Sequence, residues 1–272
     1  MQNESLCRYR AEPIHHSIQI VAQIASPLFQ KIVIWVHSRH LLITVMNLIK
    51  KIDGYEFVAY HHPEYSESEM LQRSKDFYTW MNLRRTVRDF SSQPIPIEVI
   101  HNIILTASTA PSGAHKQPWT FCVVSDPTIK KQIRKAAEKE EKESYDSRMR
   151  TEWLEDLKPL QTNWEKLFLE TAPYLIIAFK KVYDILPDGT KRNNYYVNES
   201  VGIACGFLLT AIHHAGLVAL THTPSPMNFL CKILNRPENE RPFLLIPVGH
   251  LAAETFVPNL TRKGLDSICV HY

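Results

Sequence analysis

Apolar residues recur at helical spacing in three stretches of the chain. The first follows a Ser66-x-x-Glu69 capping box and predicts a helix that ends near Arg84. The second begins at Pro96, and Ile100 and Ile104 lie on its apolar face. The third spans residues 195–215 and ends at Gly216, a residue typical of helix C-termini.

Continuous runs of strand-forming residues predict buried strands at residues 119–125 and 173–179, with shorter strands at 217–220 and 243–248. After the first strand, Asp126-Pro127 predicts the start of a long, heavily charged helix that reaches about Leu157. Helices mixed with short apolar strands predict one α+β domain over residues 61–272, with an irregular tail after Val257.

Residues 1–60 follow a different pattern, in which the apolar stretches 18–29, 32–36 and 41–49 are interrupted by Lys31 and Arg39. No run reaches the ~18–20 residues of a membrane-spanning helix, and a signal peptide would place its charge first. Three interpretations stay open: a charge-interrupted anchor, an interfacial helix, or a leader outside the fold. We favour membrane association with the folded domain in a reducing compartment; otherwise the chain would be cytoplasmic.

Composition narrows the chemistry. The chain has eight glycines in 272 residues, about 3% against a typical ~7%, and their spacings form neither G-x-G-x-x-G nor G-x-x-x-x-G-K-[ST]. Both motifs bring backbone N–H groups to phosphate, so any bound nucleotide must be held by side chains. A net charge of +3 does not indicate a nucleic-acid partner. Five cysteines without a C-x-x-C pair indicate a reducing compartment and no metal site.

Two short segments carry candidate binding chemistry. Residues 84–88 read Arg-Arg-Thr-Val-Arg, and three guanidinium groups with a hydroxyl can hold a dianionic phosphate. The alternative is a solvated helix end, where cations suit the dipole. Residues 110–114 read Ala-Pro-Ser-Gly-Ala and could lay backbone N–H groups and Ser112 against a planar ligand. The alternative is an ordinary turn, and neither segment decides alone.

At this spacing the two segments together resemble the FMN-dependent nitroreductase superfamily. The shared pattern is R-R-[ST]-x-R-x-F at residues 84–90, followed some 20 residues later by A-P-S and Q-P-W within residues 110–119. A closer resemblance, to the iodotyrosine deiodinase family, is carried by APSGAHKQPWTF, EKEEKESYDSRM, TNWEKLFLETAP, AGLVALTHTP and PNLTRKGLD. It runs from about Tyr60 to the C-terminus.

The resemblance implies a nitroreductase-like mixed sheet flanked by helices, in a domain-swapped homodimer whose FMN sites each use both subunits. The residues that it implies for FMN binding are Arg84, Arg85, Thr86, Val87, Arg88, Ser112, Thr221, His222, Thr223 and Arg262. Thr223 is the implied catalytic residue, because a hydroxyl donor to the flavin N5 atom favours one-electron steps.

The same resemblance implies four substrate-binding residues. Glu141 would bind an ammonium group, Lys166 and Tyr145 a carboxylate, and the backbone N–H of Ala114 a phenolate. Glu141 and Tyr145 are four residues apart and share one face of a helix. Glu141 also lies in the charged run 138–143, which by itself is typical of a solvated helix face. A shift of one residue in the alignment would move its role to Glu140.

The implied activity is FMN-dependent reductive dehalogenation of mono- and diiodotyrosine to tyrosine and iodide. NADPH is the implied ultimate electron source, and a separate reductase would deliver the electrons. Two alternatives stay open: a generic FMN nitroreductase, which needs no clamp for a zwitterion, and a flavoprotein that binds halotyrosine without turnover. The sequence leaves the physiological halogen and the immediate electron donor undetermined.

Overall fold

The computed structural model describes residues 35–37, 40–42 and 49–272, and the chain divides into two units, residues 1–70 and 71–272. The first unit contains two antiparallel hairpins, β1 (Trp35–His37) with β2 (His40–Leu42) and β3 (Ile49–Ile52) with β4 (Tyr55–Val58). The apolar stretch 18–29 lies outside the described residues. Among the described residues, no helix has the length and apolarity that crossing a membrane requires.

The three helices that periodicity predicts are present. The helix α1 (Glu67–Asn82) begins at the capping box, where the Ser66 N–H donates to Glu69 Oε2 at 2.9 Å. The helices α2 (Ile97–Ser108) and α6 (Val197–His214) also match the predicted bounds within about two residues. Local sequence signals are therefore sufficient for these elements.

The sheet has the strand order β10–β11–β7–β6, and β5 pairs with the C-terminal residues of β11, His250 and Leu251. Its members are β5 (Phe90–Ser91), β6 (Trp119–Val124), β7 (Tyr174–Lys181), β10 (Val218–Ala219) and β11 (Glu240–Leu251). These ladders are antiparallel, and an isolated parallel bridge joins Thr86 to Ala219. The interior of β7 is continuously apolar because both of its faces are covered.

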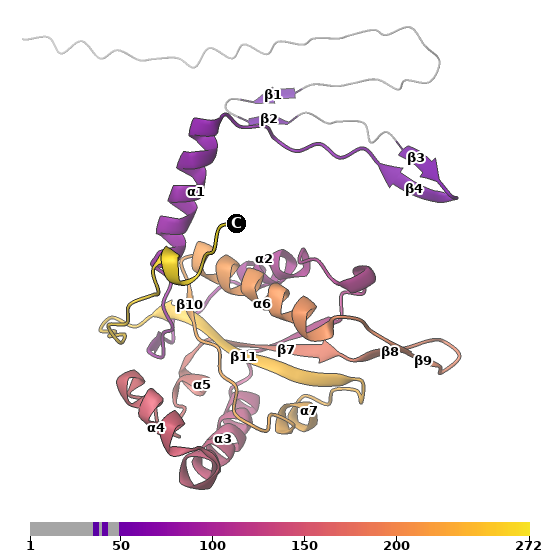
Figure 1. The fold of residues 1–272 in the computed structure, drawn as a ribbon. Helices are drawn as coiled ribbons and strands as arrows, with labels where there is room; N and C mark the ends of the chain where they lie inside the picture. Colours follow the sequence, from indigo (N-terminus) through magenta and orange to yellow (C-terminus); the bar gives the residue numbers. More distant parts are fainter. Residues whose placement is uncertain (1–34, 38–39, 43–48) are drawn as a thin grey trace, which may run out of the picture. The chain divides into compact units, whose positions relative to one another are not determined.

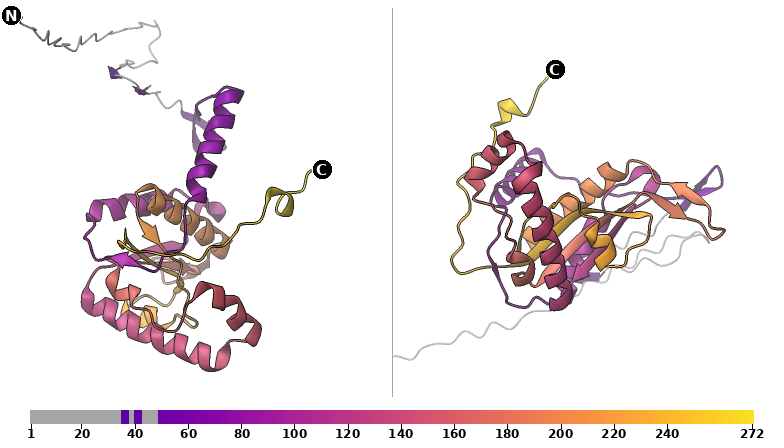
Figure 2. Two further views of the ribbon diagram at one scale, coloured as in Figure 1. Left: turned by 90° about the vertical axis from the view of Figure 1, so that its left-hand side faces the viewer. Right: turned by 90° about the horizontal axis from the view of Figure 1, so that it is seen from below.

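Helices form a layer on each side of this sheet (Figures 1 and 2). One layer is α2 and α6; the other comprises α3 (Pro127–Glu143), α4 (Thr151–Leu157), α5 (Phe168–Thr171) and α7 (Phe229–Ile233). Two apolar clusters fill the spaces, with Ile177 and Phe179 facing α3 and Ile176 and Ile246 facing α2 and α6. The predicted α+β fold, a sheet flanked by helices, is confirmed.

The prediction of one continuous helix to about Leu157 is wrong. Asp126 caps α3 as expected, accepting the Ile129 N–H at 2.9 Å. The helix then widens into a π-helical turn, η2 (Ser144–Arg148), and the backbone is extended at Met149 and Arg150 before α4 begins. Neither glycine nor proline marks the break. The break places Ser144, Tyr145 and Arg148 on the wall of one cavity.

Three further features lie outside the predicted elements. A hairpin of β8 (Tyr183–Ile185) and β9 (Lys191–Asn193) turns at Pro187-Asp188-Gly189. The strand β11 is longer than predicted and tolerates Pro242 at a register shift. Short 3₁₀ turns occur at η1 (Gly113–His115), η3 (Lys158–Leu160) and η4 (Leu265–Ser267), the last within the otherwise irregular tail.

Candidate functional site

The arginine cluster that follows α1 lines a cavity of about 380 Å³. Arg262 from the C-terminal tail joins it: its guanidinium donates to Asn82 Oδ1 at 2.8 Å and to the Arg84 carbonyl at 2.9 Å. Burial lowers the pKa of Arg84, and the charges of Arg262 and Arg85 lower it further. Within the described residues, no carboxylate pairs with these cations. Such a cluster is suited to an anion such as phosphate.

The members of the 84–88 segment do not all face this cavity. Arg84, Arg85, Thr86 and Arg88 line it. Val87 turns its side chain into the core, where it is 4% exposed, and its N–H donates to the Ala219 carbonyl at 3.2 Å. Alternation along an extended segment explains the difference, since Thr86 bridges to Ala219 in strand-like geometry.

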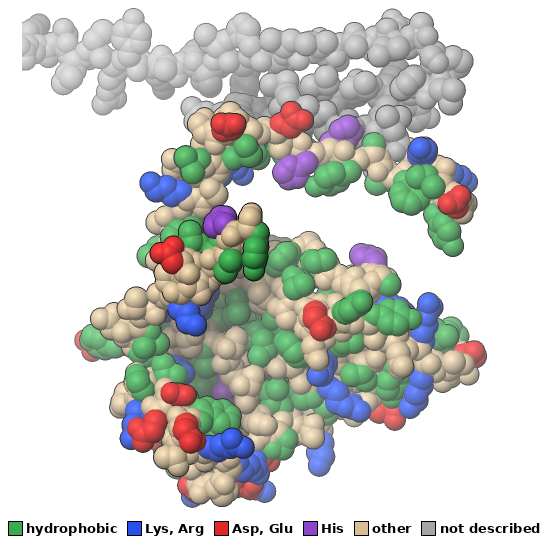
Figure 3. Space-filling model, in the orientation of Figure 1, with side chains coloured by type: hydrophobic (Ala, Val, Ile, Leu, Met, Phe, Trp, Pro, Cys, Tyr) green, Lys and Arg blue, Asp and Glu red, His purple; other side chains and the backbone are tan. Residues whose placement is uncertain are grey.

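A second cavity of about 280 Å³ shares Arg88 and Thr221 with the first. Most of the remaining sequence-predicted residues line it: Glu141, Tyr145, Lys166, His222 and Thr223. Figure 3 shows this side of residues 71–272 hollowed above the charged surface of α3 and α4. The structure therefore brings together residues from α3, η2, the segment before α5 and the loop after β10.

Lys166 is the buried centre of the second cavity. It is 3% exposed, its Nζ lies 3.4 Å from Glu141 Oε2, and it lies 5.8 Å from the centre of the Tyr145 ring. Burial lowers the pKa of Lys166, and the charge of Glu141 acts in the opposite direction. Burial also raises the pKa of Tyr145, so its hydroxyl keeps its proton. Lys166, Glu141 and Tyr145 thus supply a cation, an anion and a neutral donor to a cavity that Arg88 and Arg148 also line.

The neighbouring carboxylate, Glu140, has a different partner. Its Oε2 accepts a hydrogen bond from Arg148 Nη1 at 2.9 Å, and it does not line the second cavity. The helical turn separates the two adjacent side chains by about 100°, the rotation of one residue. Of the two glutamates, Glu141 is therefore the one beside Lys166.

His222 is a buried residue in the wall of the second cavity, and its imidazole stays neutral. It is 5% exposed, and its Nε2 atom has no hydrogen-bond partner among the described residues. Burial lowers the pKa of His222 to about 3, with smaller contributions from the charges of Lys166 and Arg88. Its backbone is fixed by two hydrogen bonds with Leu245. An unpartnered buried polar atom calls for a ligand atom or water.

These features fit a flavin mononucleotide. The first cavity, whose guanidinium groups have no carboxylate partner within the described residues, suits its phosphate. In the second cavity, the imidazole of His222 without a hydrogen-bond partner suits a polar edge of the flavin ring. The Thr223 hydroxyl lines the second cavity too and makes no hydrogen bond within the described residues. The donor set is therefore complementary to FMN without a glycine-rich turn.

The loop with Ser112 and Ala114 lines neither cavity. Ser112 Oγ accepts the Gln117 N–H at 2.9 Å, and Ala114 has a left-handed backbone with φ 50°. Gly113 between them approaches Tyr196 so closely that an added Cβ would lie 2.9 Å from its ring. Within a single chain, the structure does not bring these two predicted residues to the others.

Sequence reasoning missed several lining residues. Arg148, Trp153 and Thr162 face the second cavity, and Leu160 faces the first. Thr162 hydrogen-bonds the side chain of Tyr145, which lowers the pKa of the tyrosine against the effect of burial. These residues belong to the broken region after α3, so a sequence signal for that break would have been needed to find them.

Comparisons with known proteins agree with this geometry. Residues 82–250 match the Nitroreductase family. Iodotyrosine deiodinase of Haliscomenobacter hydrossis is 67% identical over 216 residues, covering 79% of this chain and 97% of that protein. Human iodotyrosine deiodinase 1 is 48% identical over 219 residues, covering 80% of this chain and 76% of that protein.

Solved structures show the same relationship. A crystal structure of oxidized iodotyrosine deiodinase bound to FMN and 3-iodo-L-tyrosine superimposes with a TM-score of 0.64 at 32% identity, covering 72% of this chain and 98% of that one. A nitroreductase-like protein from Streptococcus mutans shares the fold at 17% identity and a TM-score of 0.54. The chain therefore belongs to the nitroreductase family and, within it, to the iodotyrosine deiodinases.

Proposed function

We propose that this protein catalyses the FMN-dependent reductive dehalogenation of mono- and diiodotyrosine to tyrosine and iodide. The observation that carries the proposal is the position of Glu141, Tyr145 and Lys166 in one cavity, which adjoins the cavity of unpaired arginines. A generic nitroreductase has no need of a buried cation and anion that face each other.

In this proposal the cofactor is held at two ends. Arg84, Arg85, Thr86, Arg88 and Arg262 hold the phosphate and ribityl end of FMN. Residues 221–223 follow its ring, and the Thr223 hydroxyl donates to it. Val87 contributes only its carbonyl, because its side chain is buried and its N–H is already bonded. Bound FMN supplies the two electrons of the reaction.

When the substrate binds, its ammonium and carboxylate groups replace the Glu141–Lys166 ion pair by two ion pairs, one with each residue. Without substrate, Glu141 and Lys166 compensate each other at 3.4 Å. A zwitterion brings an ammonium group for Glu141 and a carboxylate for Lys166, to which the Tyr145 hydroxyl also donates. Each buried charge keeps a partner throughout, as burial requires. Held in this way, the ring loses its carbon–iodine bond, and two electrons and one proton yield a carbon–hydrogen bond and iodide.

A homodimer would complete the site. Ser112 and Ala114 line neither cavity of their own chain, so in this proposal they serve the site of a second subunit, with the Ala114 N–H directed to the substrate phenolate. The α6 face supports it, because Ile203 is 43% and Phe207 39% exposed there. NADPH, acting through a separate reductase, is the proposed source of electrons.

Residues 1–60 are proposed as a leader that associates with a membrane, and residues 61–272 as the FMN domain, which would then face a reducing compartment. The apolar stretches interrupted by Lys31 and Arg39 support this assignment. The test is fractionation of cells that express either the full chain or a chain that begins at residue 61. We expect the full chain in the membrane fraction, and recovery of both in the soluble fraction would overturn it.

The test of the proposed function uses the FMN-loaded protein reduced with dithionite. Addition of diiodotyrosine should reoxidise the flavin and release iodide, which an iodide electrode measures. Glu141→Gln and Lys166→Gln should each lower kcat/KM by at least about 100-fold, because each leaves an uncompensated buried charge worth about 3 kcal/mol or more.

A Glu140→Gln variant is the matched control, because Glu140 pairs with Arg148 rather than with Lys166. Normal turnover of diiodotyrosine by the Glu141 and Lys166 variants would favour a generic nitroreductase. A reduced protein that binds diiodotyrosine and releases no iodide would be a binding protein. A protein that takes up no FMN would overturn the whole assignment.

A further inference from the structure

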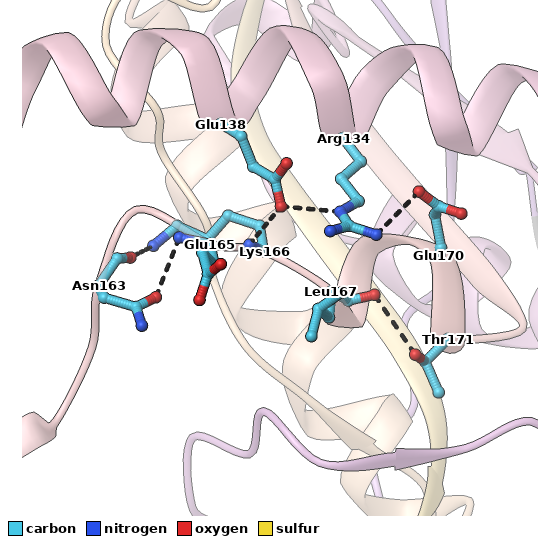
Figure 4. Close-up of polar contacts among 8 residues, drawn as sticks. All are labelled: Arg134, Glu138, Asn163, Glu165, Lys166, Leu167, Glu170 and Thr171. Atoms are coloured by element: carbon cyan, nitrogen blue, oxygen red, sulfur yellow. Dashed lines mark hydrogen bonds and ion pairs between the residues drawn. The ribbon is translucent and has the colours of Figure 1, made fainter.

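A polar stripe on α3 contacts the segment that carries Lys166, and Figure 4 shows two of its members, Arg134 and Glu138. Its members follow each other at intervals of four, four and three residues and thus share one helix face: Lys130, Arg134, Glu138 and Glu141. Lys130 Nζ donates to the carbonyls of Glu170 and Ala172, both at 2.8 Å. Arg134 Nη1 donates to Glu170 Oε1 at 3.1 Å. The stripe therefore fixes residues 166–172 along α3.

Glu138 is the member of this stripe that holds the main chain of Lys166. Its Oε1 atom accepts the Lys166 backbone N–H at 2.8 Å and the Arg134 Nε–H at 2.7 Å. Its side chain is 17% exposed and does not line the cavity that holds Glu141 and Lys166. Glu138 therefore acts on the position of Lys166 without reaching the space where a substrate would bind.

One helix thus sets both charges of the clamp. Glu141 lies one turn after Glu138 on α3, so the helix holds the Lys166 main chain through Glu138 and meets its ammonium group through Glu141. The Lys166 ammonium group also donates to the Asn163 carbonyl, which fixes its direction. A shift of the Lys166 backbone would change the separation of the two charges that receive the zwitterion.

We propose that Glu138 is a positioning residue for zwitterion recognition, which sets Lys166 against Glu141 through its hydrogen bond to the Lys166 N–H. The proposal rests on the dehalogenase function proposed above. It requires Glu138 to matter for the amino-acid group of the substrate and not for the halogenated ring or the flavin.

The experiment compares Glu138→Ala, Glu138→Gln and Glu165→Ala in the FMN-loaded protein. Dissociation constants are measured for 3-iodotyrosine and for 2-iodophenol, which has no ammonium or carboxylate group, together with kcat and KM. Glu165→Ala is the matched control: Glu165 is exposed, is adjacent to Lys166, and carries the same charge. Thermal midpoints and FMN dissociation constants report on the fold.

Glu138→Ala should bind 3-iodotyrosine about tenfold more weakly, with a matching rise in KM, as expected from the loss of a hydrogen bond to a charged group. The kcat value and the affinities for 2-iodophenol and FMN should stay unchanged. Glu138→Gln should restore 3-iodotyrosine binding, because its amide oxygen still accepts the Lys166 N–H. Glu165→Ala should behave as the unmodified protein does.

Equal losses for 3-iodotyrosine and 2-iodophenol, or no loss in Glu138→Ala, would overturn the positioning role. Should Glu138→Ala not fold, hydrogen exchange in the unmodified protein decides, and a Lys166 amide that exchanges as fast as an exposed loop contradicts the proposal. An unmodified protein that neither binds nor dehalogenates 3-iodotyrosine overturns the proposed function instead.

Discussion

At the scale of single residues, the imidazole of His222 is notable because protonation would add a third positive charge beside Lys166 and Arg88. Its side chain is buried and packs edge-on against Phe168, with ring centres 5.7 Å apart. The family resemblance places His222 in the site, but the burial that keeps it neutral is a tertiary property. No local pattern around residues 221–223 predicts it.

This burial makes stability depend on pH. The folded pKa of His222 is about 3 and the ordinary value is 6.5, so between these values the unfolded chain binds a proton that the folded chain does not. The contribution of His222 to the free energy of unfolding is fully present above about pH 6.5 and is lost as the pH falls toward 3. Between pH 7 and pH 5 we expect a loss of about 2 kcal/mol from this residue.

Urea unfolding of the unmodified protein and of His222→Phe at both pH values measures this contribution. The variant should lose about 2 kcal/mol less stability between pH 7 and pH 5 than the unmodified protein. Equal losses in the two proteins would show that His222 titrates normally in the fold.

At the scale of elements, the sequence predicts helices and inner strands well and the break after α3 poorly. The capping box at Ser66 and the apolar run of β7 are local signals, and both elements form where predicted. At the break, Arg148 contacts Glu140 and Glu143 nearby and the Ser225 carbonyl 77 residues away. Long-range contacts of this kind leave no periodicity in a single sequence.

Arg148 is the link between this broken segment and the loop after Thr223. Its Nη1 donates to the Ser225 carbonyl and to Glu140, both at 2.9 Å, and it also pairs with Glu143. Arg148→Met should therefore loosen η2 and α4, and chymotrypsin should cut near Tyr145 and Trp153 several-fold faster. Arg150→Met is the control, since Arg150 is exposed and forms no ion pair within the described residues. Equal cleavage of the two variants would rule out this link.

At the scale of the whole molecule, the cavities are assembled from segments more than 100 residues apart, such as residues 84–88 and the tail around Arg262. The residue types of the site could be named from sequence motifs, whereas their grouping into two adjoining cavities required the fold. The separation of Ser112 and Ala114 from those cavities could not be foreseen from either motif.

Self-association is the property that this separation predicts. Sedimentation should give a dimer, and Phe207→Glu should give a monomer that binds FMN weakly, although Phe207 lines neither cavity. The charge would be desolvated in an apolar interface, which is strongly unfavourable. Gln132→Glu adds the same charge to an exposed position of α3 and should leave the dimer intact. A Phe207→Glu monomer with normal FMN affinity would show that one chain suffices for the site.

The compensated pair of Glu141 and Lys166 has a consequence for the form in which a tyrosine can enter. A ligand with only one of the two charges, such as an amine without a carboxylate, would leave the opposite clamp residue buried and unpaired. A halotyrosine inside a polypeptide has lost both charges to peptide bonds and adds the bulk of its neighbours. The pocket would then act after proteolysis, on the released amino acid, and leave iodinated proteins untouched.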